Sequence, residues 1–149
     1  MKQNSRLSVA LHVLAHLAAA PAQYATSEHL SACIHTNPVV IRRTLAGLRE
    51  AAIVVSVKGH GGGWLLARAP EQISLQDVYL ALGEPAMRRV RQTAAGGGCL
   101  LEAAVGRVLD DSFRDAEALF VARLSTISLA QLTADFLQAL ATHREHRHG

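Results

Sequence analysis

Cysteine, aromatic residues and long apolar runs are all scarce in this sequence. Cys33 and Cys99 are the two cysteines among 149 residues, too few for a four-cysteine metal site or a disulfide framework within one chain. Aromatic residues make up 4%, which argues against a single-strand binder that stacks bases on aromatic rings. No apolar run approaches the roughly 20 residues that span a membrane. Free thiols without a signal peptide lead us to expect a cytoplasmic protein.

Charged residues are also few, at 18%, whereas half of the residues are hydrophobic. A chain of this length and composition can bury one compact core and extend a long helix beyond it. The formal net charge is +3 and the sequence pI is about 9.3. This modest basic excess favours a polyanionic partner, so the positions of the arginines matter more than their number.

Three helices are predicted in the first part of the chain. Leucines at helical spacing indicate one over residues 5–20, and a shorter helix follows over 26–33. Asn37 and Pro38 are typical of the first residues of a helix, so a third helix begins there. Its apolar face contains Ile41, Leu45 and Leu48, and its arginines, which lie largely off that face, are Arg42, Arg43 and Arg49.

A β-hairpin is predicted after the three helices, followed by further helices. Residues 53–57 are mostly β-branched, residues 64–66 are apolar, and a glycine-rich tip over 58–63 separates them. Helical spacing of apolar residues then indicates a helix over 74–83 and a long one over 100–124. A last helix is expected from Ser128 to about residue 140. The predicted fold class is therefore mainly α with a small β-hairpin.

The order of these elements is that of a winged helix-turn-helix followed by long helices. A helix of about 25 residues is near 37 Å long, which exceeds what one small core can cover, so its apolar stripe should form a dimer seam. The alternative is that the stripe packs on its own domain. The stripe contains Val105, Leu109, Phe113, Phe120 and Leu124. The predicted parts are a winged helix-turn-helix domain (1–83), a basic glycine-rich loop (84–99), dimerisation helices (100–142) and a disordered tail (143–149).

A helix-turn-helix followed by a β-wing is an arrangement that reads double-stranded DNA. The third helix would enter the major groove, where Asn can bond adenine, Arg can bind guanine and methyl groups can contact thymine. The wing would approach phosphates or a minor groove, with Lys58 supplying the charge. A solvated helix face beside a plain hairpin remains the alternative for each residue taken singly. The predicted contacts are Thr36, Asn37, Val39, Val40, Arg42, Arg43, Lys58, His60, Gly61 and Gly62.

Three stretches resemble the Rrf-two family of winged-helix transcriptional regulators: NSRLSVALHVLAHLA, TNPVVIRRTLAGLREAAIVVSVKGHGGGWLLARAP and ISLQDVYLAL. The resemblance spans residues 4–82, continues more weakly beyond them, and is nearest to the YwnA-like members that hold no iron–sulfur cluster. It implies a homodimer, most often a repressor, that places two recognition helices in successive major grooves of a roughly palindromic operator. It also implies phosphate contacts by Arg6 and Ser27, and a wing contact that extends to Trp64.

The sequence departs from the family pattern at positions that affect these expectations. Ala52 stands where the family usually has glycine, so the end of the third helix should differ. Arg42 replaces an acidic residue of the iron–sulfur members, so the base preference should differ from theirs. Those members use three cysteines after the wing, whereas Cys99 alone lies in that region here. We therefore expect no iron–sulfur cluster and no other cofactor.

The two cysteines receive different predictions. Cys99 directly precedes the long helix, and a helix N-terminus lowers the pKa of a thiol. It is either a redox or electrophile sensor, assisted by nearby arginines, or an ordinary small residue at a helix start. Cys33, at the end of the second helix, is expected to be a buried core thiol. The nearby arginines are Arg88, Arg89 and Arg91.

Other kinds of site find little support in the sequence. His12 and His16 lie four apart, but neither they nor the histidines of the tail have an acidic or cysteine partner at metal-ligand spacing, so no metal site is expected. No nucleophile motif or catalytic carboxylate pair indicates an enzyme, and no lysine with a hydroxyl neighbour follows the glycines as in a nucleotide-binding loop. The competing function is a winged helix that binds another protein without a DNA target. A small-molecule effector stays open.

Overall fold

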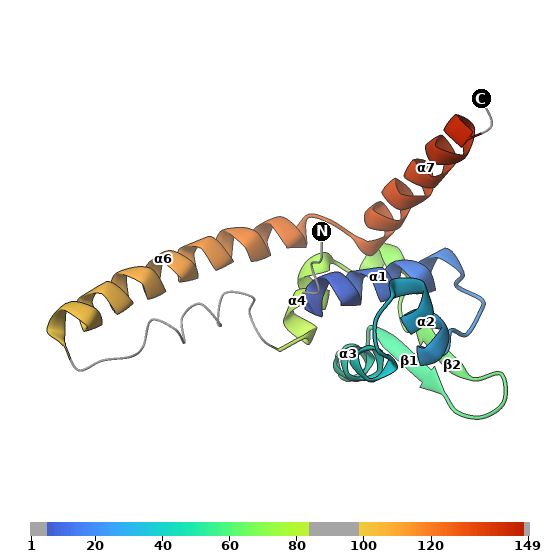
Figure 1. Ribbon diagram of the computed structural model, residues 1–149, viewed down its shortest axis with the longest axis horizontal. Coiled ribbons are helices and arrows are strands. Elements are labelled where there is room, and N and C mark those ends of the chain that lie inside the picture. Colours follow the sequence, from blue (N-terminus) through green and yellow to red (C-terminus); the bar gives the residue numbers. More distant parts are fainter. Residues whose placement is uncertain (1–5, 84–98, 148–149) are drawn as a thin grey trace.

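The computed structural model describes residues 6–83 and 99–147 of the chain. The predicted arginines Arg88, Arg89 and Arg91 lie outside these residues. Helices and a hairpin form a head from which two long helices project (Figure 1). The head contains α1 (Arg6–Ala19), α2 (Ser27–Ile34), α3 (Pro38–Glu50), β1 (Val54–Val57), β2 (Gly63–Leu66), the 3-10 turn η1 (Pro70–Gln72) and α4 (Leu75–Ala81). The projecting helices are α6 (Leu100–Ser125) and α7 (Leu129–Arg147).

The core of the head lies where α1 and α3 meet the hairpin and α4. Its side chains come from the apolar stripes that the helical spacing predicted, because one face of each helix is excluded from water. The hairpin closes one side of this core as an antiparallel pair in which Val54 lies opposite Leu66 and Val57 opposite Gly63. Completely buried members include Val13, Leu14, Leu30, Ile41, Leu45, Leu48, Ile53, Ile73 and Val78.

Hydrogen bonds at the helix ends fix where the elements of the head begin and stop. The hydroxyl of Thr26 accepts from the backbone N–H of His29 at 3.1 Å and begins α2. His35 then ends α2 in the left-handed region, with φ 57°, and so produces the tight turn into α3. Ser74 and Asp77 form a reciprocal capping box at the start of α4. These local interactions therefore set the ends of α2 and the start of α4.

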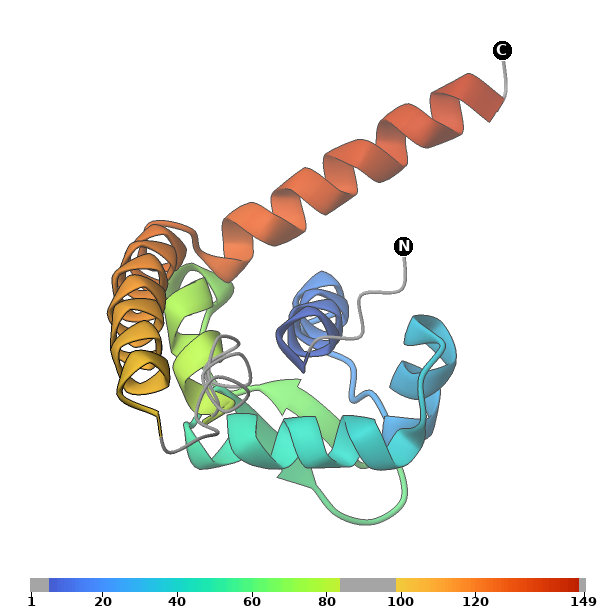
Figure 2. The same ribbon diagram turned by 60° about the vertical axis from the view of Figure 1, so that its left-hand side comes forward.

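α6 and α7 are attached to the head at their junction and then diverge from it (Figures 1 and 2). Leu75 donates its backbone N–H to Ile127, and Leu129 donates to Ile73, at 2.9 and 2.8 Å. Leu124 packs in a small cluster with Leu75 and Tyr79. Most of α6 therefore lies outside any core formed by its own chain.

The predicted fold class is confirmed, with one correction near the C-terminus. The predicted last helix was to stop near residue 140 and leave a disordered tail from 143. Instead, α7 continues to Arg147, because no glycine or proline interrupts the helix before that point. No helix among the described residues is both long and apolar enough to cross a membrane.

Candidate nucleic-acid interface

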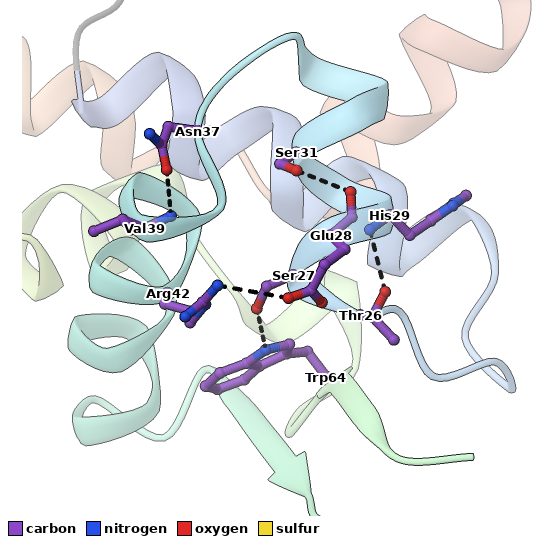
Figure 3. Close-up of polar contacts among 9 residues, drawn as sticks. All are labelled: Thr26, Ser27, Glu28, His29, Ser31, Asn37, Val39, Arg42 and Trp64. Atoms are coloured by element: carbon purple, nitrogen blue, oxygen red, sulfur yellow. Dashed lines mark hydrogen bonds and ion pairs between the residues drawn. The ribbon is translucent and has the colours of Figure 1, made fainter. Parts of the chain in front are cut away.

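The N-terminal turn of α3 is fixed by the side chain of Asn37. Its Oδ1 accepts from the backbone N–H of Val39 at 2.8 Å, and Pro38 occupies the first helical position (Figure 3). This bond uses one of the two lone pairs of Oδ1 and leaves the amide N–H groups for another acceptor. Asn37 thus both begins the helix and presents a donor at its exposed end.

α3 divides its side chains sharply between core and solvent. Ile41, Leu45 and Leu48 are completely buried, whereas Val39 and Val40 are exposed by 55% and 41%. Exposed aliphatic side chains on a recognition helix can contact thymine methyl groups. Arg42 and Arg43 are also exposed and Thr36 is half-buried. The structure therefore brings the predicted base-contacting residues of α3 together on one helix end.

Glu28 is a residue of this surface that the sequence analysis did not identify. Its Oε1 lies 3.5 Å from Nη2 of Arg42, so α2 and α3 are joined by an ion pair (Figure 3). The two side chains are exposed by 69% and 57%. The order of residues along the chain gives no sign of this pairing, because the residues lie on different helices.

Ser27 and Trp64 connect the wing to the helix-turn-helix. The indole N–H of Trp64 donates to the hydroxyl of Ser27 at 3.2 Å (Figure 3), and the backbones of Trp64 and Ala25 exchange hydrogen bonds at 2.9 and 3.1 Å. Arg49 lies 5.9 Å above the centre of the indole ring, within the range of a cation–π contact. Ser27 is 7% exposed, and by accepting the indole N–H its hydroxyl supports the wing; its phosphate contact stays a prediction.

The wing tip is exposed and depends on its glycines. Lys58 and His60 are exposed. A Cβ on Gly62 would lie 2.3 Å from the carbonyl oxygen of Val57, and one on Gly63 would lie 2.7 Å from that of Ala25. Both distances are below any real contact, so these two glycines are needed by the hairpin itself. Gly61 and Gly62 are predicted DNA contacts; at Gly62 and Gly63 the structure supplies a reason for glycine that is internal to the fold.

Arg6 is a predicted phosphate contact that lies apart from this surface. It is exposed at the first residue of α1. Its neighbour Leu7 packs against the cluster that joins α4 to α6, whereas α3 and the wing lie on the side of the head away from α7 (Figures 1 and 2). The structure thus groups the α3 and wing residues and leaves Arg6 outside the group.

Comparison with known proteins matches residues 3–135 to the Rrf2 family, described as iron-dependent transcriptional regulators. The chain belongs to the Rrf2 family. It is 30% identical over 126 residues to YwnA of Bacillus subtilis, provisionally named an HTH-type transcriptional regulator, covering 85% of this chain and 92% of YwnA. YwgB of the same organism, also provisionally named an HTH-type transcriptional regulator, is 32% identical over 83 residues, covering 55% of this chain and 53% of YwgB. The family resemblance expected from the sequence is confirmed.

Solved structures give the same answer for the fold. A protein from Lactobacillus plantarum, provisionally described as a transcriptional regulator, is 27% identical with a TM-score of 0.74, covering 96% of each chain. IscR of T. potens is 20% identical with a TM-score of 0.64, covering 93% of this chain and 90% of that one. The second likeness concerns the fold alone.

Side chains of this Rrf2 member that could bind the iron named in the family description are dispersed among the described elements. Among residues 6–83 and 99–147, no three His, Cys, Asp or Glu side chains lie together as ion ligands. Cys33 lies on α2 and Cys99 at the start of α6, so the two thiols belong to different elements. His12 and His16 follow each other on α1, and Nδ1 of His12 bonds the carbonyl oxygen of Ser8 at 2.9 Å.

Both cysteines are exposed, which corrects the prediction for Cys33. Cys33 lies at the end of α2 on its outer face, with Sγ 3.6 Å from Nε2 of His29, because the apolar stripe of this short helix runs through Leu30 instead. Cys99 is the N-cap residue of α6. The backbone N–H groups of Leu101, and then of Glu102, lower the pKa of the Cys99 thiol, as expected at a helix N-terminus.

The predicted dimer seam on α6 divides into two parts. Leu124 is 7% exposed and packs in its own chain. The ring of Phe120 contacts the ring of Tyr79 edge-on, with 5.4 Å between the two ring centres. Phe113 is half-buried. Val105 and Leu109, nearer the start of α6, are exposed by 50% and 38%. Further apolar residues of α6 and α7 that were not predicted as part of the seam are also exposed, and they are Leu100, Leu101, Val108, Leu119, Phe136 and Leu137.

Proposed function

We propose that this protein is a homodimer that binds a palindromic operator in double-stranded DNA and represses transcription there. The observation that carries the proposal is the exposed basic surface formed by the start of α3 and the wing tip. Arg42, Arg43, Lys58 and His60 are all exposed on it, and α3 and the hairpin lie on one side of the head (Figures 1 and 2). Such a surface fits a major groove and the minor groove or phosphates beside it.

The residues of α3 and of the wing have different proposed roles. Asn37, Arg42 and Arg43 contact base edges, since they lie at the end of the helix that enters the groove. Lys58 and His60 contact phosphates or the minor groove, where charge matters more than base identity. Arg43→Ala should therefore relax specificity at one operator position. Lys58→Ala should weaken binding to all sequences evenly and reduce the salt slope by about 1.

Dimerisation is proposed because α6 and α7 expose more apolar surface than a single chain can cover. α6 has 26 residues, of which Leu124 is the one buried residue. A groove of about 430 Å³ between α1 and α7 is lined largely by apolar side chains, including Leu11, Leu132 and Phe136. Exposed apolar patches of this kind mark interaction surfaces, and a second copy of the chain is the occupant we propose.

The proposed regulator works without an iron–sulfur cluster or other cofactor, and no catalytic role is assigned to it. The lowered pKa of the Cys99 thiol makes this residue a candidate sensor of oxidants or electrophiles. If Cys99 has this role, peroxide should weaken DNA binding by the wild-type protein but not by Cys99→Ser. Equal sensitivity of both proteins would remove the sensor. Binding to chromosomal DNA places the proposed action in the cytoplasm.

Selection of duplexes from a randomised library tests the proposed function and identifies the operator in the same experiment. The expected product is an inverted repeat whose half-sites lie about 10 base pairs apart, or a multiple of this. Sedimentation of the complex should give two chains per duplex. Failure to enrich any sequence, even at low salt, would contradict the proposal and favour a protein-interaction module.

A further inference from the structure

We propose that Glu28 is a specificity-determining residue, which orients Arg42 toward its base and penalises binding to other sequences. The proposal rests on the DNA-binding function proposed above. Its basis is the ion pair between Oε1 of Glu28 and Nη2 of Arg42, at 3.5 Å. A carboxylate at the start of a DNA-reading surface opposes phosphate binding, so its presence there calls for an explanation.

Stability of the fold does not supply that explanation. The two side chains are exposed by 69% and 57%, and ion pairs exposed to this degree contribute little to folding. Nor is the pair needed to begin either helix, because Thr26 caps α2 and Asn37 caps α3. The ion pair is therefore free to serve the surface rather than the core.

The geometry of the pair leaves Arg42 able to read a base. A guanidinium has five N–H donors in a planar arrangement, and Glu28 approaches one terminal nitrogen. Two donors suffice for a bidentate contact with guanine, so Glu28 and a base can be bound together. By limiting the rotamers of Arg42 in the free protein, Glu28 reduces the side-chain entropy lost on binding.

The charge of Glu28 acts in the opposite direction when the base is wrong. On any duplex, the carboxylate is brought toward phosphates and repelled by them. At the correct site the ordered contact of Arg42 offsets this repulsion, whereas at other sites nothing does. Specificity is a difference between two affinities, and a repulsive group can widen it.

Arg43 offers an internal comparison on the same helix. It is exposed like Arg42, but within the part of the chain that the structure describes it has no ion pair with an acidic side chain. Glu28 should therefore affect the base read by Arg42 and leave the base read by Arg43 unchanged.

The test uses the full chain with Glu28→Gln, Arg42→Ala and the double variant, with Glu71→Gln as the control. Glu71 is an exposed residue of η1, the turn that packs against α7, so Glu71→Gln removes the same charge away from the interface. Thermal unfolding by circular dichroism establishes that each variant is folded. Each protein is then used to select duplexes from a randomised library, and anisotropy measures binding to the selected and to shuffled duplexes.

Glu28→Gln should raise affinity for shuffled duplexes by about threefold or more, the scale of one like-charge repulsion near the surface. It should also weaken the base preference at one operator position, and this second effect should vanish in the Arg42→Ala background. Behaviour identical to Glu71→Gln, or an undiminished loss of base preference in the Arg42→Ala background, would overturn the proposal. Absence of any preferred sequence for the wild-type protein would instead contradict the proposed function itself.

Discussion

Ala52 adopts a backbone conformation that favours glycine, with φ 56° directly after α3. An L-residue in this region costs roughly 1–2 kcal/mol, against roughly 0.5–1 kcal/mol for the extra freedom that glycine loses on folding. Ala52→Gly should therefore raise the free energy of unfolding by about 0.5–1 kcal/mol. Urea denaturation provides the measurement.

Ala51 supplies a matched control for that substitution. It precedes Ala52 and has φ −83°, where alanine carries no such penalty. Ala51→Gly should lower stability by about 0.5–1 kcal/mol. Equal effects at both positions would mean that Ala52 bears no strain. The sequence predicted a difference at this helix end from the missing glycine, but the conformation itself came from the structure.

His16 makes stability depend on pH in a defined direction. Burial, followed by the charges of His12 and His29, lowers the pKa of the His16 imidazole. In the unfolded chain, His16 takes up a proton near the ordinary histidine pKa of roughly 6.5. In the folded protein, the same imidazole resists protonation. Stability should therefore fall as pH decreases below that value and through the lower folded pKa. His16→Gln should flatten this dependence in chemical denaturation at pH 7 and pH 5; identical slopes for both proteins would refute it.

At the scale of elements, the contact of the wing with α2 depends on Ser27. Ser27→Ala would leave the part-buried indole N–H of Trp64 without its acceptor, at a cost of about 1–2 kcal/mol. Hydrogen exchange should also accelerate in β1 and β2. A suitable control is Ser112→Ala, because the exposed hydroxyl of Ser112 donates to the carbonyl oxygen of Val108 in its own helix. A Ser27→Ala protein that unfolds like wild type but binds DNA weakly would favour the phosphate contact predicted from the sequence over this structural role.

Elements and contacts between elements differ in how far the sequence predicts them. The helices were predictable because leucine spacing, Thr26, Asn37 and Pro38 are local signals. The Ser27–Trp64 hydrogen bond joins residues 37 positions apart, and the Glu28 ion pair joins two helices, so neither has a local signal. Cys33 was placed in the core because cysteine is usually buried, whereas the register of α2 turns it outward.

At the scale of the whole molecule, the start of α6 should be the contact between two chains. Leu109 is partly exposed in the single chain, so Leu109→Glu should preserve the fold but bury a charge in the dimer, which is costly. Sedimentation should then show monomers at concentrations where the wild-type protein is dimeric. Arg107→Glu, which introduces a carboxylate on the opposite face of α6, should leave the dimer intact. A dimeric Leu109→Glu protein would place the seam elsewhere.

The most direct test of the whole proposal is fluorescence anisotropy across a range of salt concentrations. The full-length protein is titrated against a duplex from its own selected sequence and against a shuffled duplex of the same composition. A regulator that reads bases from α3 and phosphates from the wing should prefer the selected duplex by roughly a thousandfold or more, with a steep salt dependence. Equal binding to both duplexes, or no binding at low salt, would contradict the central claim.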